Sequence, residues 1–200
     1  MQIKVYKEVE MKRIVCLLAA ILLVFVLTAC GGDEGVPTGY KIASNSEACR
    51  YTLYVPEGWI ASPGENKTDY TMSTVSNTDA CNISLSVVTD VASGESFEAF
   101  WTAEEASYRT IFHEGFEVLE KGTVVKVGDA SGFRCVFTAR FGGKDYKYMQ
   151  VFIPRSDFFT SELYAFTYTA SADKVEGKDI THYDEHLETV NGILTLVKWK

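Results

Sequence analysis

The chain has 200 residues, of which 46% are hydrophobic and 23% charged, a composition typical of a globular protein and not of a disordered one. Its 19 basic and 27 acidic residues give a formal net charge of −8. This acidic balance argues against nucleic-acid binding, which needs a basic footprint, and against adsorption to anionic lipid through charge.

The first predicted element is a signal peptide at residues 1–29. Lys12 and Arg13 precede an unbroken apolar run over residues 14–27. The run is shorter than the roughly 20 residues of a membrane span and suits the apolar part of a leader. Met11 would open a leader of ordinary length, so we treat it as an alternative start.

The apolar run ends at Leu27-Thr28-Ala29-Cys30-Gly31-Gly32, which resembles a bacterial lipobox. The resemblance implies cleavage before Cys30 and attachment of diacylglycerol to its Sγ, with palmitate among the acyl chains. An ordinary secretory leader with a chance cysteine is the alternative. Because two acyl chains hold a protein stably on a membrane, we expect a lipoprotein anchored on the extracytoplasmic face of the cell membrane. Residues 30–39 then form a flexible tether.

Residues 40–200 are predicted to form a single domain that begins with strands. Strands are expected at residues 49–55, 69–75 and 81–89, and the last two form a hairpin. A turn is expected at Pro56-Glu57-Gly58. Residues 96–113 then change to helical periodicity, with Ser96 as the N-cap.

The second half of the domain predicts four more strands and a final helix. The strands cover residues 116–127, 132–141, 144–154 and 162–170, and the helix covers residues 181–197. Short links between consecutive strands predict an antiparallel sheet in an α+β domain. The strand at 144–154 is apolar on both sides, so we expect the two helices to cover both faces of the sheet.

The stretch from Tyr51 to Trp59 (YTLYVPEGW) resembles the opening of PsbP-like domains, in which a strand is followed by Pro, an acid, Gly and Trp. The later order of elements is similar as well, and the resemblance covers about residues 40–198. It implies an α/β/α sandwich with an antiparallel sheet. It implies no function, because domains on this fold serve as accessory or interaction modules in unrelated systems.

His182 and His186 belong to an H-x-x-E-H pattern, which is that of inverted zinc peptidases. On a helix these two side chains share one face. A zinc site needs a third protein ligand, and Glu188 is the only acid that follows. We therefore interpret the pattern as a solvated helix start and expect no metal and no other cofactor, with His182 and His186 as weak metal candidates.

Three cysteines remain after the leader and Cys30. Cys49 and Cys81 each open a predicted strand, and we expect them to pair as a disulfide across neighbouring strands. Reduced buried thiols are the alternative. Cys135 alternates with Phe133 and Phe137 and is interpreted as a core thiol.

No nucleophile, base or metal set converges in the sequence, so we expect no enzymatic activity. The expected function is an interaction or accessory role, with an envelope protein as partner. The first alternative is a small-ligand-binding lipoprotein with a pocket between the sheet and the helix at 96–113; an envelope hydrolase is the second. Four aromatic residues near strand ends or in a loop are candidates for an exposed patch or for local packing: Tyr51, Tyr70, Phe158 and Phe159.

Overall fold

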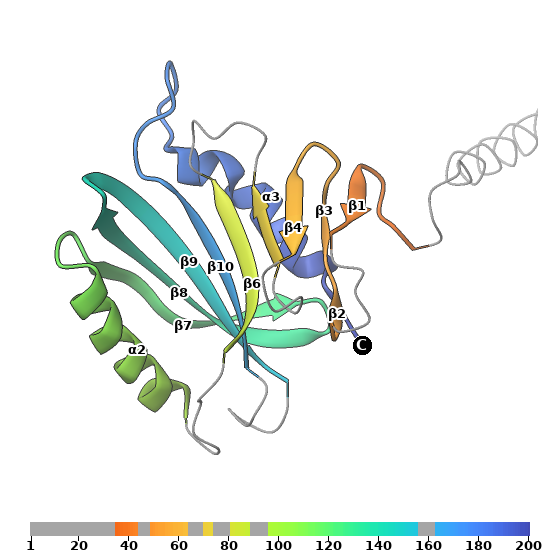
Figure 1. The fold of residues 1–200 in the computed structure, drawn as a ribbon, viewed down its shortest axis with the longest axis horizontal. Coiled ribbons are helices and arrows are strands. Elements are labelled where there is room, and N and C mark those ends of the chain that lie inside the picture. The colour runs from red at the N-terminus through yellow and green to blue at the C-terminus, as the bar shows by residue number, and fades with distance from the viewer. Residues whose placement is uncertain (1–34, 44–48, 64–69, 74–80, 89–95, 156–162) are drawn as a thin grey trace, which may run out of the picture. The chain divides into compact units, whose positions relative to one another are not determined.

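The computed structural model describes residues 35–43, 49–63, 70–73, 81–88, 96–155 and 163–200 (Figure 1). The chain divides into two compact units, Met1–Thr38 and Gly39–Lys200, and the architecture below is that of the second. Cys30, Phe158 and Phe159 lie outside the described residues. None of the helices in the described part of the chain is long and apolar enough to cross a membrane.

A seven-stranded sheet forms the centre of the second unit, and all of its neighbouring strands pair antiparallel. In spatial order its strands are β4 (Ile60–Pro63), β5 (Tyr70–Ser73), β6 (Asn82–Val88), β10 (Leu163–Ser171), β9 (Lys144–Pro154), β8 (Ala130–Phe141) and β7 (Glu117–Val127). The unit also has two separate two-stranded sheets. One pairs β1 (Tyr40–Ile42) with β3 (Tyr54–Pro56), and the other pairs β2 (Tyr51–Thr52) with β11 (Lys198–Trp199).

Two helices of 15 residues each begin where the sequence predicts. The first, α2 (Phe97–Ile111), has Ser96 as its N-cap, and the Ser96 hydroxyl accepts a hydrogen bond from the Ala99 amide. The second, α3 (His182–Leu196), begins with a capping box between Thr181 and Asp184. Both caps satisfy amide groups that the first turn of a helix leaves unpaired.

The two helices lie on opposite faces of the sheet (Figure 1). Trp101 of α2 is fully buried in one core cluster, and Tyr183, Val190 and Ile193 of α3 are buried in the other. Strand β9 supplies alternate residues to both clusters, such as Phe152 to the first and Val151 to the second. This confirms the expected α+β sandwich with an antiparallel sheet and helices on both faces.

The structure differs from the prediction in its short strands. The expected strand at 49–55 is interrupted at Leu53, because β2 pairs with β11 while β3 pairs with β1. Strands β1, β4 and β11 were not predicted. Each has two to four residues, which is too short for a hydrophobic period to stand out, and pairing with distant segments selects their extended conformation.

Candidate interaction site at the β7 edge

Strand β7 is one of the two edges of the central sheet, and within the described residues its only strand partner is β8. The other edge, β4, has four residues and ends at a proline, which limits pairing with a further strand. In contrast, β7 has 11 residues and no proline. Its Val124 and Leu119 side chains are 65% and 50% exposed. Long exposed edges are templates for pairing with another chain.

The two halves of β7 differ in regularity. Register shifts between Val118 and Glu120 and between Glu120 and Thr123 disturb the first half, and Gly122 has a φ of +74° there. Such bulges discourage pairing with a new strand. From Thr123 to Val127 the register against β8 is continuous. The second half of β7 is therefore the part of the edge that remains suited to accept a strand.

The turn after β7 determines which backbone groups of this half point outward. A two-residue turn at Gly128 and Asp129 joins Val127 to its register partner Ala130. In a hairpin of this kind the closing pair is hydrogen-bonded and the pairs then alternate. The amide and carbonyl groups of Val124 and Lys126 are consequently directed away from β8, toward the open side of the sheet.

A pocket of about 230 Å³ lies next to this half of β7, on the side covered by α3. Its apolar lining comes from Val125 and Leu194. Its polar lining comes from β7, β8 and α3, namely Lys126, Arg134, Asn191 and Thr195. The helix contributes residues three and four positions apart, which share one helix face. The amide of Gly128 donates a hydrogen bond of 3.0 Å to the Leu194 carbonyl, which holds the hairpin against α3.

Arg134 is a half-buried charged residue of this lining. Its Nε and Nη2 donate hydrogen bonds of 2.8 and 3.2 Å to the two carboxylate oxygens of Glu120, and the two side chains are 29% and 31% exposed. Partial burial raises the pKa of the Glu120 carboxyl, but hydrogen bonds from Arg134 and Thr123 together with the positive charge of Arg134 bring that pKa below its ordinary value. Glu120 thus holds the guanidinium in place beside the pocket.

We expect this pair to stabilise the fold in a pH-dependent way. Because the pKa of Glu120 is lowered in the folded state, its contribution is present above the unfolded pKa of about 4.3 and is lost as the pH falls through the folded value. At pH 7 the Glu120→Gln variant should unfold with a free energy about 1 kcal/mol below wild type. Urea unfolding from pH 7 to pH 3 should show this difference disappearing in acid, and a constant difference would contradict the assignment.

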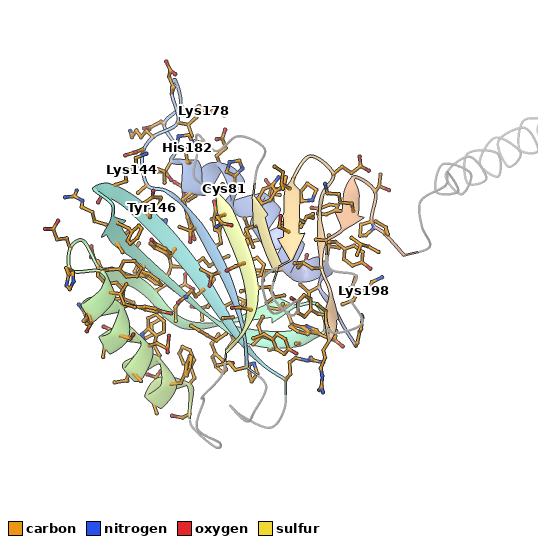
Figure 2. All side chains as sticks on the ribbon, in the orientation of Figure 1. Cys81, Lys144, Tyr146, Lys178, His182 and Lys198 are labelled. Atoms are coloured by element: carbon orange, nitrogen blue, oxygen red, sulfur yellow. The ribbon has the colours of Figure 1, made fainter. Side chains whose placement is uncertain are left out.

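The metal candidates do not form a site in the described residues. Lys178, which precedes α3, and His182, its first residue, lie close together (Figure 2). Both side chains are near the carboxylate of Glu185. Lys178 forms an ion pair with Glu185 and lowers its pKa through their hydrogen bond, whereas the Nδ1 of His182 is 3.9 Å away. His186 instead packs edge-on against Trp59. No group of three His, Cys, Asp or Glu side chains in the described ranges is placed to hold a metal ion.

The cysteines lie in the core. Cys49 and Cys81 are both buried in the cluster beneath α3, and Figure 2 shows Cys81 at the start of β6. The strands that follow them do not pair with each other, since β2 pairs with β11 and β6 pairs with β5 and β10. The assumption of neighbouring strands was therefore wrong, while the Cys49–Cys81 disulfide itself stays a prediction.

Alkylation of the denatured protein followed by mass spectrometry tests that disulfide. With Cys30 acylated, we expect one alkylated thiol, that of Cys135, without reductant and three with reductant. The closed loop would contribute roughly 3–4 kcal/mol to stability in the chain-entropy model. Three alkylated thiols without reductant would rule the disulfide out.

Cys135 is a core thiol, as predicted, and is fully buried on the α2 face between the sheet and the helix. Burial raises the pKa of this thiol to about 11, so it is protonated at neutral pH. On the same face, rings of α2 interlock with rings of the sheet: Tyr108 stacks on Phe137 at 5.3 Å and Phe100 packs edge-on against Phe152 at 5.0 Å. Side chains thus fill much of the space where the ligand-binding alternative placed its pocket.

The residues that form the β7 site were not predicted from the sequence. One signal was available in the sequence. Glu120 and Arg134 have opposite charges, and they stand in two consecutive predicted strands at positions where an apolar residue would be expected to face the core. The candidate aromatic patch fared differently. Tyr51 is buried and packs on Tyr164 and Trp199, which favours local packing over an exposed patch at this residue. The structure does not describe the side chain of Tyr70.

Comparisons with known proteins bear on the fold. No protein-family model and no curated protein sequence matches the chain. Three of the solved structures to which this chain is similar are described below. Mog1p, a Ran-binding protein of Saccharomyces cerevisiae, has a TM-score of 0.53 at 11% identity, over 80% of this chain and 95% of its own. LpqN, involved in cell envelope biogenesis of Mycobacterium tuberculosis, has a TM-score of 0.39 at 14% identity, over 84% of this chain and 86% of its own.

The third similarity is to a protein of Bacteroides thetaiotaomicron, with a TM-score of 0.44 at 11% identity over 76% of this chain. The match covers 45% of that protein, so this chain spans less than half of its length. At such identities a structural similarity shows the fold alone. The similarity to Mog1p agrees with the α+β fold, in which two helices cover a mainly antiparallel sheet.

Proposed function

We propose that this protein is a lipid-anchored accessory protein of the bacterial cell envelope that binds a partner protein through the edge of β7 and catalyses no reaction. The observation that carries the proposal is the regular, open half of β7, where Val124 is 65% exposed and two residues direct backbone groups outward. The leader supports the location, because its positive residues, apolar run and Cys30 follow one another in the order of a lipoprotein signal.

The positions of the chemically reactive groups favour binding over catalysis. A cysteine nucleophile needs a base within hydrogen-bond reach. Cys135 is fully buried on the α2 face, whereas His182 and His186 belong to α3 on the opposite face and His113, which follows α2, is exposed. The resemblance to Mog1p, itself named a Ran-binding protein, is consistent with protein recognition on this fold, as an analogy at the level of the fold.

The alternative, a small-ligand-binding lipoprotein, is favoured by the pocket beside α3. Its volume of about 230 Å³ is smaller than the roughly 300 to 1,000 Å³ of sites for drug-sized ligands. A pocket of this size suits a single side chain or a very small molecule, which is why we place protein binding first.

Affinity capture of the full chain from detergent-solubilised membranes of its native host tests the proposal. Wild type should retain a partner at a constant stoichiometry, and the Val124→Lys variant should lose it, because a charge on an edge strand opposes strand addition. The matched control is Ile111→Lys, since Ile111 is 56% exposed on α2. Equal capture by wild type and both variants would contradict a role for the β7 edge.

A further inference from the structure

We infer that the partner presents an extended strand to β7 and places an acidic side chain from that strand in the pocket beside Arg134. The inference rests on the proposed function, because it assumes that the β7 edge is the docking surface. It adds the chemistry of the partner: a β-strand with an aspartate or glutamate on the side that faces α3.

The backbone of β7 sets the register of such a strand. The outward amide and carbonyl groups of Val124 and Lys126 offer two donors and two acceptors to an added strand. Residues of the added strand opposite Val124 and Lys126 then have their side chains on the α2 side. The residue opposite Val125 has its side chain on the α3 side, where the pocket lies.

The two sides of β7 favour different side chains on the partner strand. On the α2 side, Val124 pairs in register with Phe133, which packs against the core of that face, so an apolar residue opposite Val124 would extend an apolar surface. On the α3 side, Val125 packs against the other core and lines the pocket together with Arg134. The partner strand should therefore alternate apolar and acidic residues.

Charge complementarity identifies the acid. The chain as a whole is acidic, with a net charge of −8, yet Arg134 lines the pocket and none of the described lining residues is a carboxylate. The Lys126 ammonium lies on the other side of β7, where it donates a hydrogen bond to Ser131. Glu120 occupies two nitrogens of the Arg134 guanidinium, and the third, Nη1, makes no hydrogen bond to the described residues. Asn191 and Thr195 add an amide and a hydroxyl to the same lining. An incoming carboxylate could therefore accept a hydrogen bond from the Nη1 of Arg134.

Selection from a phage-displayed library of random heptapeptides tests this inference. The target is the full chain in detergent micelles, with counter-selection on the Val124→Lys variant. We expect enriched peptides in which an aspartate or glutamate alternates with apolar residues. Changing that acid to its amide in the synthetic peptide should weaken binding about tenfold or more, because a hydrogen bond to a charged group is lost.

Variants of the pocket sharpen the test. Asn191→Asp adds a carboxylate to the lining at an exposed position and should weaken the acidic peptide about tenfold or more. Thr102→Asp on α2 places the same charge on the opposite face and controls for long-range repulsion. Anisotropy titrations give the dissociation constants of the peptide for wild type, Asn191→Asp and Thr102→Asp.

Three results would overturn the inference, and they separate it from the proposed function. Peptides that need Val124 but carry no acid, or that bind Asn191→Asp as tightly as wild type, would refute the acidic partner and leave the edge as a docking surface. Failure to obtain any peptide that needs Val124 would refute strand addition itself. Loss of membrane capture by Val124→Lys is a separate measurement and bears on the proposed function alone.

Discussion

Replacing Gly128 by alanine should lower the free energy of unfolding by about 3–5 kcal/mol, a loss at the upper end of single substitutions. Gly128 has a φ of +60°, in the left-handed region, which costs an alanine about 1–2 kcal/mol. A Cβ at this position would also lie 1.9 Å from the carbonyl oxygen of Val197. The turn between β7 and β8 must therefore move away from the end of α3.

That movement would break the contacts that join the hairpin to the C-terminal segment. The Gly128 amide donates to the Leu194 carbonyl at 3.0 Å, and the indole Nε1 of Trp199 donates to the Val127 carbonyl at 2.9 Å. Each such hydrogen bond is worth about 1 kcal/mol net. Because Leu194 also lines the pocket beside β7, the same substitution should disturb the candidate site.

Gly142→Ala is the matched control for Gly128→Ala. Gly142 has nearly the same φ, +59°, but a Cβ there would meet nothing within 4 Å. We expect a loss of about 1–2 kcal/mol from the backbone alone. Urea unfolding of both variants measures the difference in unfolding free energy from the shift of the transition midpoint, when the dependence of that free energy on urea concentration is unchanged. Equal losses would show that the approach of Gly128 to Val197 does not constrain the fold.

Replacing Cys30 by alanine should abolish acylation completely and leave an uncut precursor. The reason is chemical: in the proposed anchor the lipid would be joined through the Cys30 Sγ, and processing of a lipoprotein leader depends on that modification. Metabolic labelling with palmitate and the intact mass of the purified protein report the two effects. The matched control is Cys16→Ala, in the apolar run over residues 14–27, and we expect this variant to label and mature like wild type. Palmitate labelling of Cys30→Ala would refute the lipobox.

Local patterns were sufficient to predict most of the architecture. Helical periodicity after Ser96 predicted α2, and the helix predicted at residues 181–197 is α3. The short link between the strands predicted at 132–141 and 144–154 is the turn between β8 and β9. The two apolar sides of β9 predicted that both faces of the sheet are covered. These features depend on neighbours in the chain, where periodicity is informative.

The candidate site could not be predicted in the same way, because it depends on strand order. Strand β7 is an edge because β6, the strand before it in the chain, pairs with the distant β10 and not with β7. The bulges in the first half of β7 shift its side-chain alternation, so a strict period of two misplaces the residues that follow. Asn191 is at the site because α3 packs across β7, a contact that the helical stripe alone does not specify.

Photocrosslinking in intact cells of the native host tests the central claim most directly. A photoreactive amino acid is placed at Val124 on the open edge or at Ile111 on α2, two side chains of similar exposure. If β7 is the docking edge, irradiation should give one protein adduct of defined mass from position 124 and none from position 111. Identical adducts from both positions, or no protein adduct from position 124, would contradict the assignment of this protein as an accessory protein that binds its partner through β7.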